Sequence, residues 1–299
     1  ASRGLFKVNS STGKPVTVVN TRAQLSQCIR AWKQTGETVG FVPTMGALHG
    51  GHLSLIEKAR EKASRTVASI FVNPTQFAAG EDFDTYPRDA DADIARLESV
   101  DCDLVYLPSV EEMYPEGNTT NVRVEGMSDL LDGVYRPHFF YGVTTVVARL
   151  FLHVQPDVAV FGEKDYQQLQ IIRRMVRDLG FPVEILGGET TRDGDGLAQS
   201  SRNLYLKPDE RIAAGALQGA LHRASVRLAI GVTPSVALDE ARALIMAAGF
   251  RTLDYVSLVD PDTLRDLPDT PLAPGTVARL LGAAWMGKTR LIDNISATR

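Results

Sequence analysis

Short runs of β-branched and other apolar residues recur along the first two thirds of the chain, with amphipathic stretches between them. The runs do not alternate with polar positions, which is typical of strands buried on both faces of a parallel sheet. The predicted strands are Thr38–Val42, Val67–Val72, Asp103–Leu107, Asp157–Phe161 and Val183–Leu186. The helices predicted between them include His52–Lys62, Ala90–Ser99 and Tyr166–Leu179. This alternation predicts an α/β fold built on a doubly wound parallel sheet.

The pattern changes near residue 190, where glycines interrupt a polar segment. Gly187, Gly188, Gly194 and Gly196 indicate a loop that can act as a hinge. Beyond it, the predicted helices are Asp209–Ala229 and Ser235–Ala248, and the predicted strands are Leu253–Val259, Val277–Leu281 and Thr289–Asn294. We therefore expect a Rossmann-like domain over residues 1–188 and a smaller C-terminal α+β domain over residues 189–299, which closes on the first as a lid.

Composition narrows the class of protein. The net charge of −4 over 299 residues gives no basic field that would attract nucleic acid or an anionic membrane. The sequence has no apolar run of about 18 residues, and its first residues lack the apolar core of a secretory signal. Cys28 and Cys102 form neither a disulfide framework nor a zinc cluster. We expect a cytoplasmic protein that binds neither nucleic acid nor membrane.

A glycine-rich turn joins the first clear strand to the next helix. It reads Pro43-Thr-Met-Gly-Ala-Leu-His-Gly-Gly-His52. Its glycines allow a tight turn and close approach of a ligand. The helix that follows offers unpaired N–H groups and the positive end of its dipole, which together favour a phosphate group. The segment is not a Walker A loop, because no Gly-Lys-Ser/Thr follows.

This turn contains two of the five histidines of the chain. His49 and His52 are three residues apart and would share one face of a helix. Two imidazoles at this position can donate hydrogen bonds to an α-phosphate and to a departing pyrophosphate. The alternatives are a zinc pair or two unrelated surface histidines. The absence of a nearby cluster of further histidines or cysteines favours the phosphate interpretation over zinc.

Three later segments carry polar groups suited to the same ligands. Asn73 and Gln76 follow a strand, at the edge where doubly wound sheets bind ligands, although an Asn-Pro turn alone is only a turn. Lys164 and Asp165 also follow a strand and can bind phosphate and ribose, or form a solvated helix start. The segment Leu197–Asn203 supplies two serine hydroxyls and an arginine, a set suited to phosphate.

Together, these four segments resemble the pantothenate synthetase (pantoate–β-alanine ligase) family, in the nucleotidylyltransferase superfamily with its HIGH-type motif. The resemblance extends from about residue 16 to about residue 296. It implies an AMP-forming carboxylate–amine ligase that condenses pantoate with β-alanine through a pantoyl adenylate and releases AMP and pyrophosphate. It also implies ATP as a substrate, Mg²⁺ held mostly by phosphate oxygens, and a homodimer.

The resemblance also assigns roles to individual residues. Catalysis is assigned to His52, His49 and Lys164. ATP binding is assigned to Met45, Gly46, His49, Gly51, His52, Gly162, Glu163, Lys164, Asp165, Thr191, Gln199, Ser200, Ser201 and Arg202. Binding of pantoate is assigned to Pro43, Asn73, Gln76 and Gln168. No protein ligand for a metal is identified.

The sequence departs from the family pattern at four positions. Gly50 stands where the family usually has Glu, Phe139 where it has His, and Gln199 where it has a hydrophobic residue; Glu189 makes the expected adenine site more polar. His138 lies one place before the usual histidine. We expect pantoate to remain the preferred acid, with slow turnover or an altered preference for the amine.

The departures keep three rival functions open. One is a paralogous adenylate-forming ligase that joins a different hydroxy acid or amine. Another is a nucleotidyl transferase that stops after AMP transfer, against which Gln76 and Gln168 argue. The third is a non-catalytic nucleotide-binding protein, against which the retained histidines, Lys164 and the Ser-Ser-Arg set argue.

Overall fold

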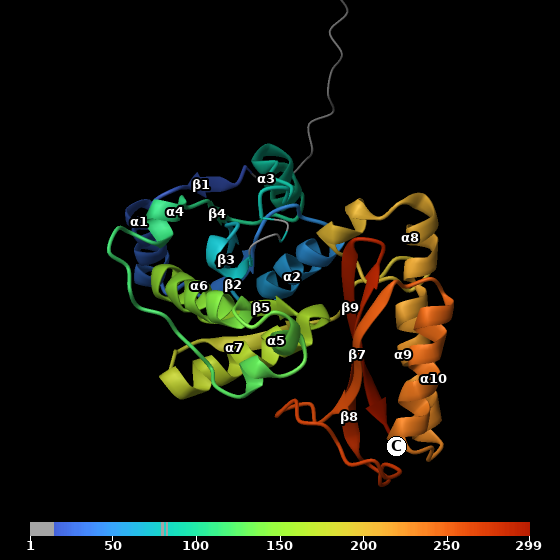
Figure 1. The fold of residues 1–299 in the computed structure, drawn as a ribbon. Coiled ribbons are helices and arrows are strands. Elements are labelled where there is room, and N and C mark those ends of the chain that lie inside the picture. Colours follow the sequence, from blue (N-terminus) through green and yellow to red (C-terminus); the bar gives the residue numbers. More distant parts are fainter. Residues whose placement is uncertain (1–14, 79–80, 82) are drawn as a thin grey trace, which may run out of the picture.

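Two sheets organise the chain in a computed structural model that describes residues 15–78, 81 and 83–299 (Figure 1). One sheet has six strands in the order β1-β4-β3-β2-β5-β6, and every pairing in it is parallel. The other has three antiparallel strands in the order β7-β8-β9. The predicted doubly wound parallel sheet followed by a smaller α+β unit is therefore confirmed. No helix among the described residues has the length and apolar character needed to cross a bilayer.

The parallel sheet occupies the first two thirds of the chain. Its strands are β1 (Thr17–Val19), β2 (Val39–Thr44), β3 (Arg65–Ile70), β4 (Leu104–Tyr106), β5 (Val158–Gly162) and β6 (Glu184–Gly188). The central strands are mostly apolar and buried because helices cover both of their faces. The strand order reverses its direction between β2 and β5, so the carboxyl ends of these two strands border the crevice where such sheets bind ligands.

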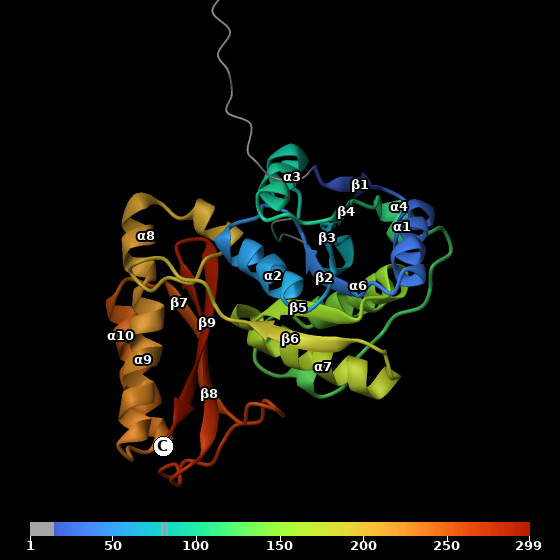
Figure 2. The same cartoon turned by 180° about the vertical axis from the view of Figure 1, so that it is seen from behind.

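Helices cover the parallel sheet on two sides. Helices α1 (Arg22–Gln34), α6 (Phe139–Val154) and α7 (Tyr166–Leu179) share one core with the sheet, whereas α2 (Gly50–Arg60) and α3 (Ala90–Ser99) share the other. The short elements are α4 (Val110–Met113), α5 (Asp132–Tyr135), η1 (Pro74–Gln76), η2 (Met127–Asp129) and η3 (Glu163–Asp165). Figure 2 shows α2 and α7 from the opposite side.

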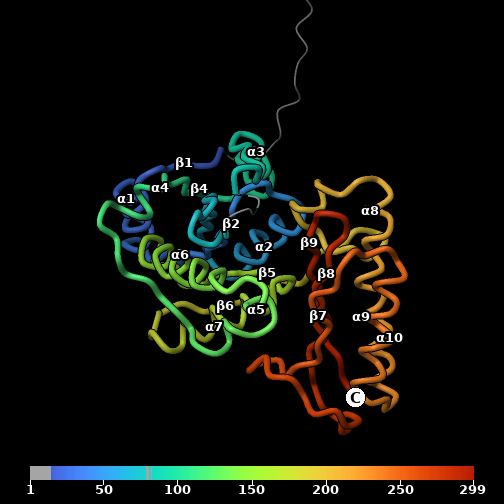
Figure 3. Tube along the Cα trace, in the orientation of Figure 1, coloured from blue at the N-terminus to red at the C-terminus, as the bar shows by residue number. Residues whose placement is uncertain are grey.

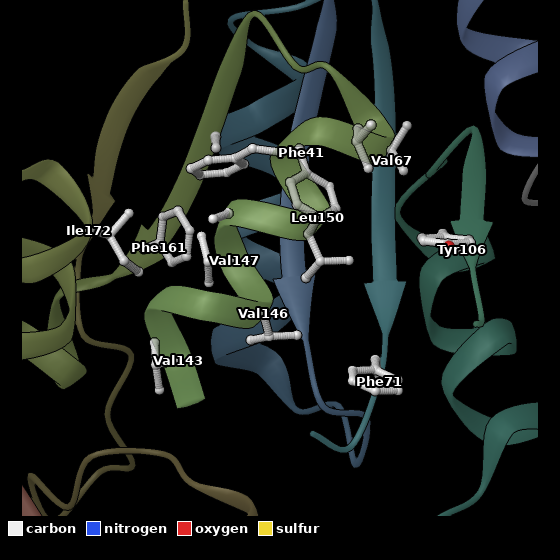
Figure 4. Packing of buried hydrophobic residues seen from close by; sticks show 14 of the residues in the cluster. Phe41, Val67, Phe71, Tyr106, Val143, Val146, Val147, Leu150, Phe161 and Ile172 are labelled. Atoms are coloured by element: carbon white, nitrogen blue, oxygen red, sulfur yellow. The ribbon is translucent and has the colours of Figure 1, made fainter. Parts of the chain in front are cut away.

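The sequence pattern did not predict α6, which is the most buried helix of this unit. Its Val143, Val146 and Val147 are β-branched and have low intrinsic helix propensity, so the local signal is weak. Tertiary packing overrides that propensity, because these side chains belong to the same buried cluster as Phe41 and Phe161 (Figure 4). The same helix carries one wall of the candidate active site.

The second unit packs helices on one face of the antiparallel sheet (Figure 3). Its elements are η4 (Ser201–Tyr205), α8 (Pro208–Ala214), α9 (Ala216–Ala229), α10 (Pro234–Ala247), β7 (Thr252–Val259), β8 (Val277–Met286) and β9 (Thr289–Thr298). The single helix predicted over Asp209–Ala229 is two helices that meet at Gly215, where a side chain would come within 2.8 Å of the Asp195 carbonyl oxygen. Strands β8 and β9 extend beyond their predicted ends because they form one long hairpin.

The prediction that Gly187 and Gly188 lie in a loop is wrong. Both belong to β6, where they pair with Phe161 and Gly162 of β5. An added Cβ at Gly188 would overlap the Leu55 side chain of α2, and one at Gly187 would come within 2.9 Å of Glu163 Oε1. These glycines therefore permit close packing against the sheet, whereas Gly194 and Gly196 remain in the connection between the units.

Candidate active site

A central pocket of about 210 Å³ lies at the carboxyl ends of β2 and β5. It brings together nearly all of the residues that the sequence nominated: Pro43, Met45, His49, Gly51, His52, Asn73, Gln76, Gly162, Lys164, Asp165, Gln168, Thr191, Gln199, Ser200, Ser201 and Arg202. These residues come from both sides of the connection that follows β6. The arrangement therefore depends on the second unit docking against the parallel sheet.

Two nominated residues do not line this pocket. Gly46 has φ +84°, and an added Cβ would come within 2.9 Å of an Asp93 carboxylate oxygen, so its contribution is the shape of the turn. The Glu163 side chain points to Arg279, at 3.4 Å, rather than into the pocket. The spacing of a motif could not reveal this, because neighbouring side chains in a turn point in different directions.

The two histidines have fixed orientations at the start of α2. His49 is the N-cap, and its Nδ1 accepts a hydrogen bond from the Gly51 amide at 3.2 Å. His52 Nδ1 accepts from the His49 amide at 3.3 Å. A neutral imidazole that accepts at Nδ1 carries its proton on Nε2. Each ring therefore has an Nε2–H group available to donate to a ligand, and the ring centroids are 4.1 Å apart.

Both imidazoles are neutral near pH 7. Burial lowers the pKa of His52 to about 3, and the neighbouring His49 and Lys164 add to the effect. Burial also lowers the pKa of His49 to about 4, with a further contribution from the charge of Lys164. The pair consequently acts through hydrogen-bond donation in the free protein, while the positive charge in this part of the pocket comes from Lys164.

These lowered pKa values predict that acid destabilises the fold. A histidine whose pKa is lower in the folded than in the unfolded state binds fewer protons when folded, so stability falls as the pH drops below about 6.5. At pH 5 each of the two should cost about 1–2 kcal/mol. The free energy of unfolding in urea, measured from pH 7 to pH 5, should therefore fall less in the double variant His49→Gln/His52→Gln than in the wild type. His222→Gln, at an exposed position, should keep the wild-type dependence of the free energy of unfolding on pH. The same dependence in the double variant would contradict the interpretation that both imidazoles are buried and neutral.

A buried aspartate that the sequence analysis missed holds the turn before His49. Asp93 of α3 is 3% exposed, and its two carboxylate oxygens accept hydrogen bonds from the Ala47 and Leu48 amides, each at 2.8 Å. Ala47 has φ +50°, an uncommon conformation for a residue with a side chain, so the turn needs such support. In the sequence, Asp93 is one of several acidic residues at the start of a helix, and nothing local distinguishes it.

Asn73 and Gln76 form a hydrogen-bonded pair at the end of the pocket next to Met45. Gln76 Oε1 accepts from Asn73 Nδ2 at 3.1 Å, and Gln76 Nε2 lies 3.0 Å from the Met45 sulfur. Asn73 also donates to the Gly142 carbonyl and accepts from the Tyr114 hydroxyl, and it is 1% exposed. Asn73 thus orients Gln76, whose amide is the group that faces the pocket.

Apolar side chains of α6 complete this end of the pocket. Val143, Val146 and Val147 line it together with Phe71 and Phe161. Figure 4 shows the side chains of these five residues. An apolar wall opposite two glutamine amides fits a small branched acid that carries hydroxyl groups.

Phe139 lines the pocket and His138 does not. The Phe139 ring lies under the guanidinium of Arg136, at 3.8 Å from ring centroid to carbon, and Arg136 forms two hydrogen bonds of 2.7 Å with Glu81. His138 is exposed at the start of α6. His138 therefore does not supply the hydrogen bonds that a histidine at position 139 would make.

Strand β9 supports the turn that carries Lys164. Asn294 Nδ2 donates to the Glu163 and Lys164 carbonyl oxygens at 2.9 and 2.8 Å. Lys164 is mostly buried, and its ammonium group is 3.9 Å from Asp165. The Ser201 hydroxyl lies 3.2 Å from that of Tyr86. The sequence analysis missed Asn294, because its role depends on a contact between residues that are 130 positions apart.

The departures at Gly50 and Gln199 occupy the same space. Gln199 Oε1 accepts from the Gly51 amide at 3.1 Å, and Gln199 Nε2 donates to Asp193 at 3.0 Å. A Cβ added at Gly50 would lie 2.9 Å from Gln199 Oε1. The glutamine therefore fills the volume that a side chain at position 50 would need, and the two positions should be energetically coupled.

A double-mutant cycle would measure this coupling. Gly50→Glu alone should weaken ATP binding, because the new side chain competes with Gln199 for one site. The double variant Gly50→Glu/Gln199→Met should recover part of the lost affinity for ATP. The coupling energy, calculated from the ATP dissociation constants of the four proteins in the cycle, should be about 1 kcal/mol. Gly219→Glu, at an exposed position of α9 with open space around it, provides the control. Additive effects of the two substitutions would contradict the coupling.

A larger side cavity of about 690 Å³ lies between the two units and opens onto the central pocket at Phe139, Lys164 and Arg202. Its charged groups are largely matched in pairs. Arg290 bonds to both Asp132 and Asp254 at 2.7 Å, and Tyr255 donates to Asp132 at 2.9 Å. A cavity with both signs of charge suits a zwitterion better than a polyanion.

Comparison with known proteins gives a consistent result. The family model described as Pantoate-beta-alanine ligase matches residues 17–296. The pantothenate synthetase of Hyphomonas neptunium is 73% identical over 293 residues, which cover 98% of this chain and all of that protein. The crystal structure of the Thermus thermophilus pantothenate synthetase is 48% identical, with a TM-score of 0.89, and covers 95% of this chain and all of that one. The pantoate-beta-alanine ligase of Francisella tularensis, complexed with beta-gamma ATP and beta-alanine, is 33% identical, with a TM-score of 0.79, over 94% of this chain and 97% of that one.

Proposed function

The chain belongs to the pantoate–beta-alanine ligase family, and we propose that it condenses pantoate with β-alanine in two steps. The first step forms a pantoyl adenylate and the second step consumes it. The observation that carries the proposal is the central pocket itself. There, neutral imidazoles, a lysine and a Ser-Ser-Arg segment face two glutamine amides and an apolar wall. Such a pocket has phosphate-binding groups at one end and groups for a hydroxy acid at the other.

In the first step, a pantoate carboxylate oxygen attacks the α-phosphorus of ATP. The new oxygen–phosphorus bond forms as the bond to the bridging oxygen breaks, and its electron pair leaves with pyrophosphate. His52 and His49 donate Nε2–H bonds to the phosphate oxygens, where charge grows in the transition state, and Lys164 supplies the positive charge. Little covalent work is required of the protein, so positioning accounts for most of the rate.

Gln76 and Gln168 hold the acid for this attack. Their amides bind its hydroxyl and carboxylate oxygens, while the valines of α6 contact its methyl groups. Pro43 and Met45 close the same end of the pocket. Asn73 keeps the Gln76 amide in place rather than contacting the acid through a free group of its own.

In the second step, the uncharged β-alanine amine attacks the acyl carbon of the adenylate. The bond from that carbon to the phosphate oxygen breaks, its electron pair leaves with AMP, and the nitrogen releases one proton as the amide forms. We propose that β-alanine enters through the side cavity, because this cavity opens onto the central pocket at Phe139, Lys164 and Arg202. Its mixture of carboxylates and cations is suited to an ammonium group and a carboxylate on one small molecule. Meanwhile the central pocket keeps the adenylate away from water.

Mg²⁺ would accompany ATP and offset the charge of its phosphates. The described residues contain no group of three or more His, Cys, Asp or Glu side chains placed to hold a metal ion. Mg²⁺ does not need one, because it keeps several waters and takes ligands from substrate phosphates. Asp165, at the edge of both cavities, is assigned to the ribose hydroxyls.

Several wider features belong to the same proposal. We place the boundary between the ATP- and pantoate-binding domain and the C-terminal lid after residue 188, with the hinge at Gly194 and Gly196. Crystals with and without an adenylate analogue should then differ in the angle between the domains.

We also propose that the protein is a homodimer in the cytoplasm. A sedimentation mass near 32.5 kDa at micromolar concentration would refute the dimer.

One assay separates this function from its rivals. Purified protein with ATP, pantoate and β-alanine should form AMP and pantothenate in equal amounts. Exchange of pyrophosphate into ATP should depend on pantoate and not require the amine. A panel of other hydroxy acids and amines tests the paralogous ligase, since rapid exchange with another acid but not with pantoate would favour that alternative. Phe139→His in the same panel tests whether this departure slows the amine step.

A further inference from the structure

Strand β9 of the second unit contacts the turn that carries Lys164 through a residue outside the central pocket. Asn294 is 2% exposed, and it lines neither the central pocket nor the side cavity. Its Nδ2 group donates to the carbonyl oxygens of Glu163 and Lys164, at 2.9 and 2.8 Å. In Figures 1 and 2 the three-stranded sheet lies between the parallel-sheet unit and helices α9 and α10. Asn294 therefore joins the two units at the turn from which the Lys164 side chain reaches the pocket.

Two local sources of support for the Lys164 turn are missing or weak. Neither Gly162, which precedes η3, nor Asp165, which precedes α7, forms a side-chain hydrogen bond that caps the helix after it. The ammonium group of Lys164 is 3.9 Å from the partly exposed Asp165 carboxylate, and an ion pair of this length contributes little. The position of the lysine therefore depends on the backbone of the turn, where Asn294 holds two carbonyl groups.

Arg279 of β8 fixes the orientation of the Asn294 carboxamide. A guanidinium group can only donate hydrogen bonds, and Arg279 Nε donates to Asn294 Oδ1 at 2.7 Å. The NH₂ group of Asn294 must then face the two carbonyl oxygens of the turn. The guanidinium of Arg279 is itself placed over the Tyr166 ring, at 4.2 Å from carbon to ring centroid. Both donors of Asn294 therefore point at the Lys164 turn in a fixed geometry.

The preceding residue of β9 holds a second segment of the site. Asp293 is 4% exposed and accepts two hydrogen bonds from the Arg192 guanidinium, at 2.6 and 2.9 Å. Arg192 also donates to the Gly196 carbonyl at 3.0 Å, in the connection that leads to Gln199 and Ser200. Adjacent side chains of a strand point to opposite faces, so β9 can hold both segments at once. The position of this one strand thus bears on two segments that line the central pocket.

We propose that Asn294 is a positioning residue for Lys164, so that docking of the second unit on the parallel sheet places the lysine ammonium group against the phosphates of ATP. This inference rests on the proposed adenylation step. When the two units separate, the Asn294 amide leaves the Glu163 and Lys164 carbonyl oxygens, and the turn loses the contact that fixes it. The lysine then reaches its productive position only after the second unit has docked, when the pocket is closed to water.

The test is the kinetics of Asn294→Asp in pantoate-dependent ATP–pyrophosphate exchange. Aspartate has nearly the same shape and keeps the acceptor for Arg279, but it presents an oxygen to the two carbonyl oxygens in place of the NH₂ group. The kcat should fall about tenfold to a hundredfold, the scale of a displacement of about 1 Å at a reacting group. The KM for pantoate should change much less, because Gln76 follows a different strand, β3. Asn294→Leu buries no new charge and should show the same loss, and it replaces Asn294→Asp if that variant does not fold.

Two further measurements separate the placement of Lys164 from a general loosening between the units. In a Lys164→Met background, assayed at higher protein concentration, Asn294→Asp should cause no further loss, because the effects of residues that act as a unit are not additive. Tyr166→Phe is the matched control. It removes the 3.2 Å hydrogen bond from the Tyr166 hydroxyl to the Pro261 carbonyl, which joins the same two units, and it should keep wild-type exchange.

Three results would overturn the inference while the proposed function stands. They are wild-type exchange in a folded Asn294→Asp protein, the same loss with and without Lys164, and an equal loss in Tyr166→Phe. If the wild type itself shows no pantoate-dependent exchange, the proposed function fails. Crystal structures of the wild type and Asn294→Leu then still test the inference: the Lys164 ammonium group should be displaced in the variant, and the same position in both would contradict the role of Asn294.

Discussion

Replacing His52 by alanine should reduce pantoate-dependent ATP–pyrophosphate exchange about 100-fold to 1000-fold, the usual effect of removing one donor to developing charge. The His52 ring is held by the His49 amide, with its Nε2–H free to reach the phosphates. The loss should appear in kcat more than in the KM for ATP, because the hydrogen bond strengthens as charge grows. The imidazole is neutral at pH 7, so the pH profile of the wild type should show no histidine step near pH 6.5.

Two further variants make this result specific. His52→Gln keeps an N–H donor and should recover part of the activity. His222→Ala, at an exposed position on α9, should behave as wild type. Circular dichroism and unfolding in urea would show that the fold persists in each. A folded His52→Ala protein with near-wild-type exchange would show that the role given to His52 is wrong.

Replacing Asp93 by alanine should lower the free energy of unfolding by about 2–6 kcal/mol, because two buried backbone amides lose their acceptors at about 1–3 kcal/mol each. These amides belong to Ala47 and Leu48, directly before His49. The turn should also lose its fixed position, so exchange activity should fall although Asp93 touches no substrate. Urea unfolding and exchange kinetics would measure the two effects.

The comparison variants for Asp93 are on the same helix. Asp93→Asn keeps one acceptor oxygen and should lose about half as much stability. Asp91→Ala, at an exposed position in the first turn of α3, should change stability by about 0.5 kcal/mol or less. If Asp93→Ala were as stable as Asp91→Ala, the two hydrogen bonds would not support the turn.

The sequence alone determined the architecture and most of the pocket. Buried strands such as Val39–Thr44 and Val158–Gly162 consist mostly of consecutive apolar residues. They can therefore be recognised in the sequence without knowing which strands lie beside them. Motif residues such as His49, Lys164 and Ser200 are likewise close in sequence to the strands or loops that carry them. The topology of a parallel sheet then brings these loops to one edge.

The tertiary structure alone decided how those residues are oriented and supported. Asp93 and Asn294 act on turns that are distant in the sequence, and helix α6 forms because its valines fill a core rather than because of helix propensity. Gly187 and Gly188 look like loop residues until the Glu163 and Leu55 side chains that approach them in β6 are known. Local patterns report the conformation of the backbone, whereas hydrogen-bond partners, close approaches and cavities arise only when distant segments pack together.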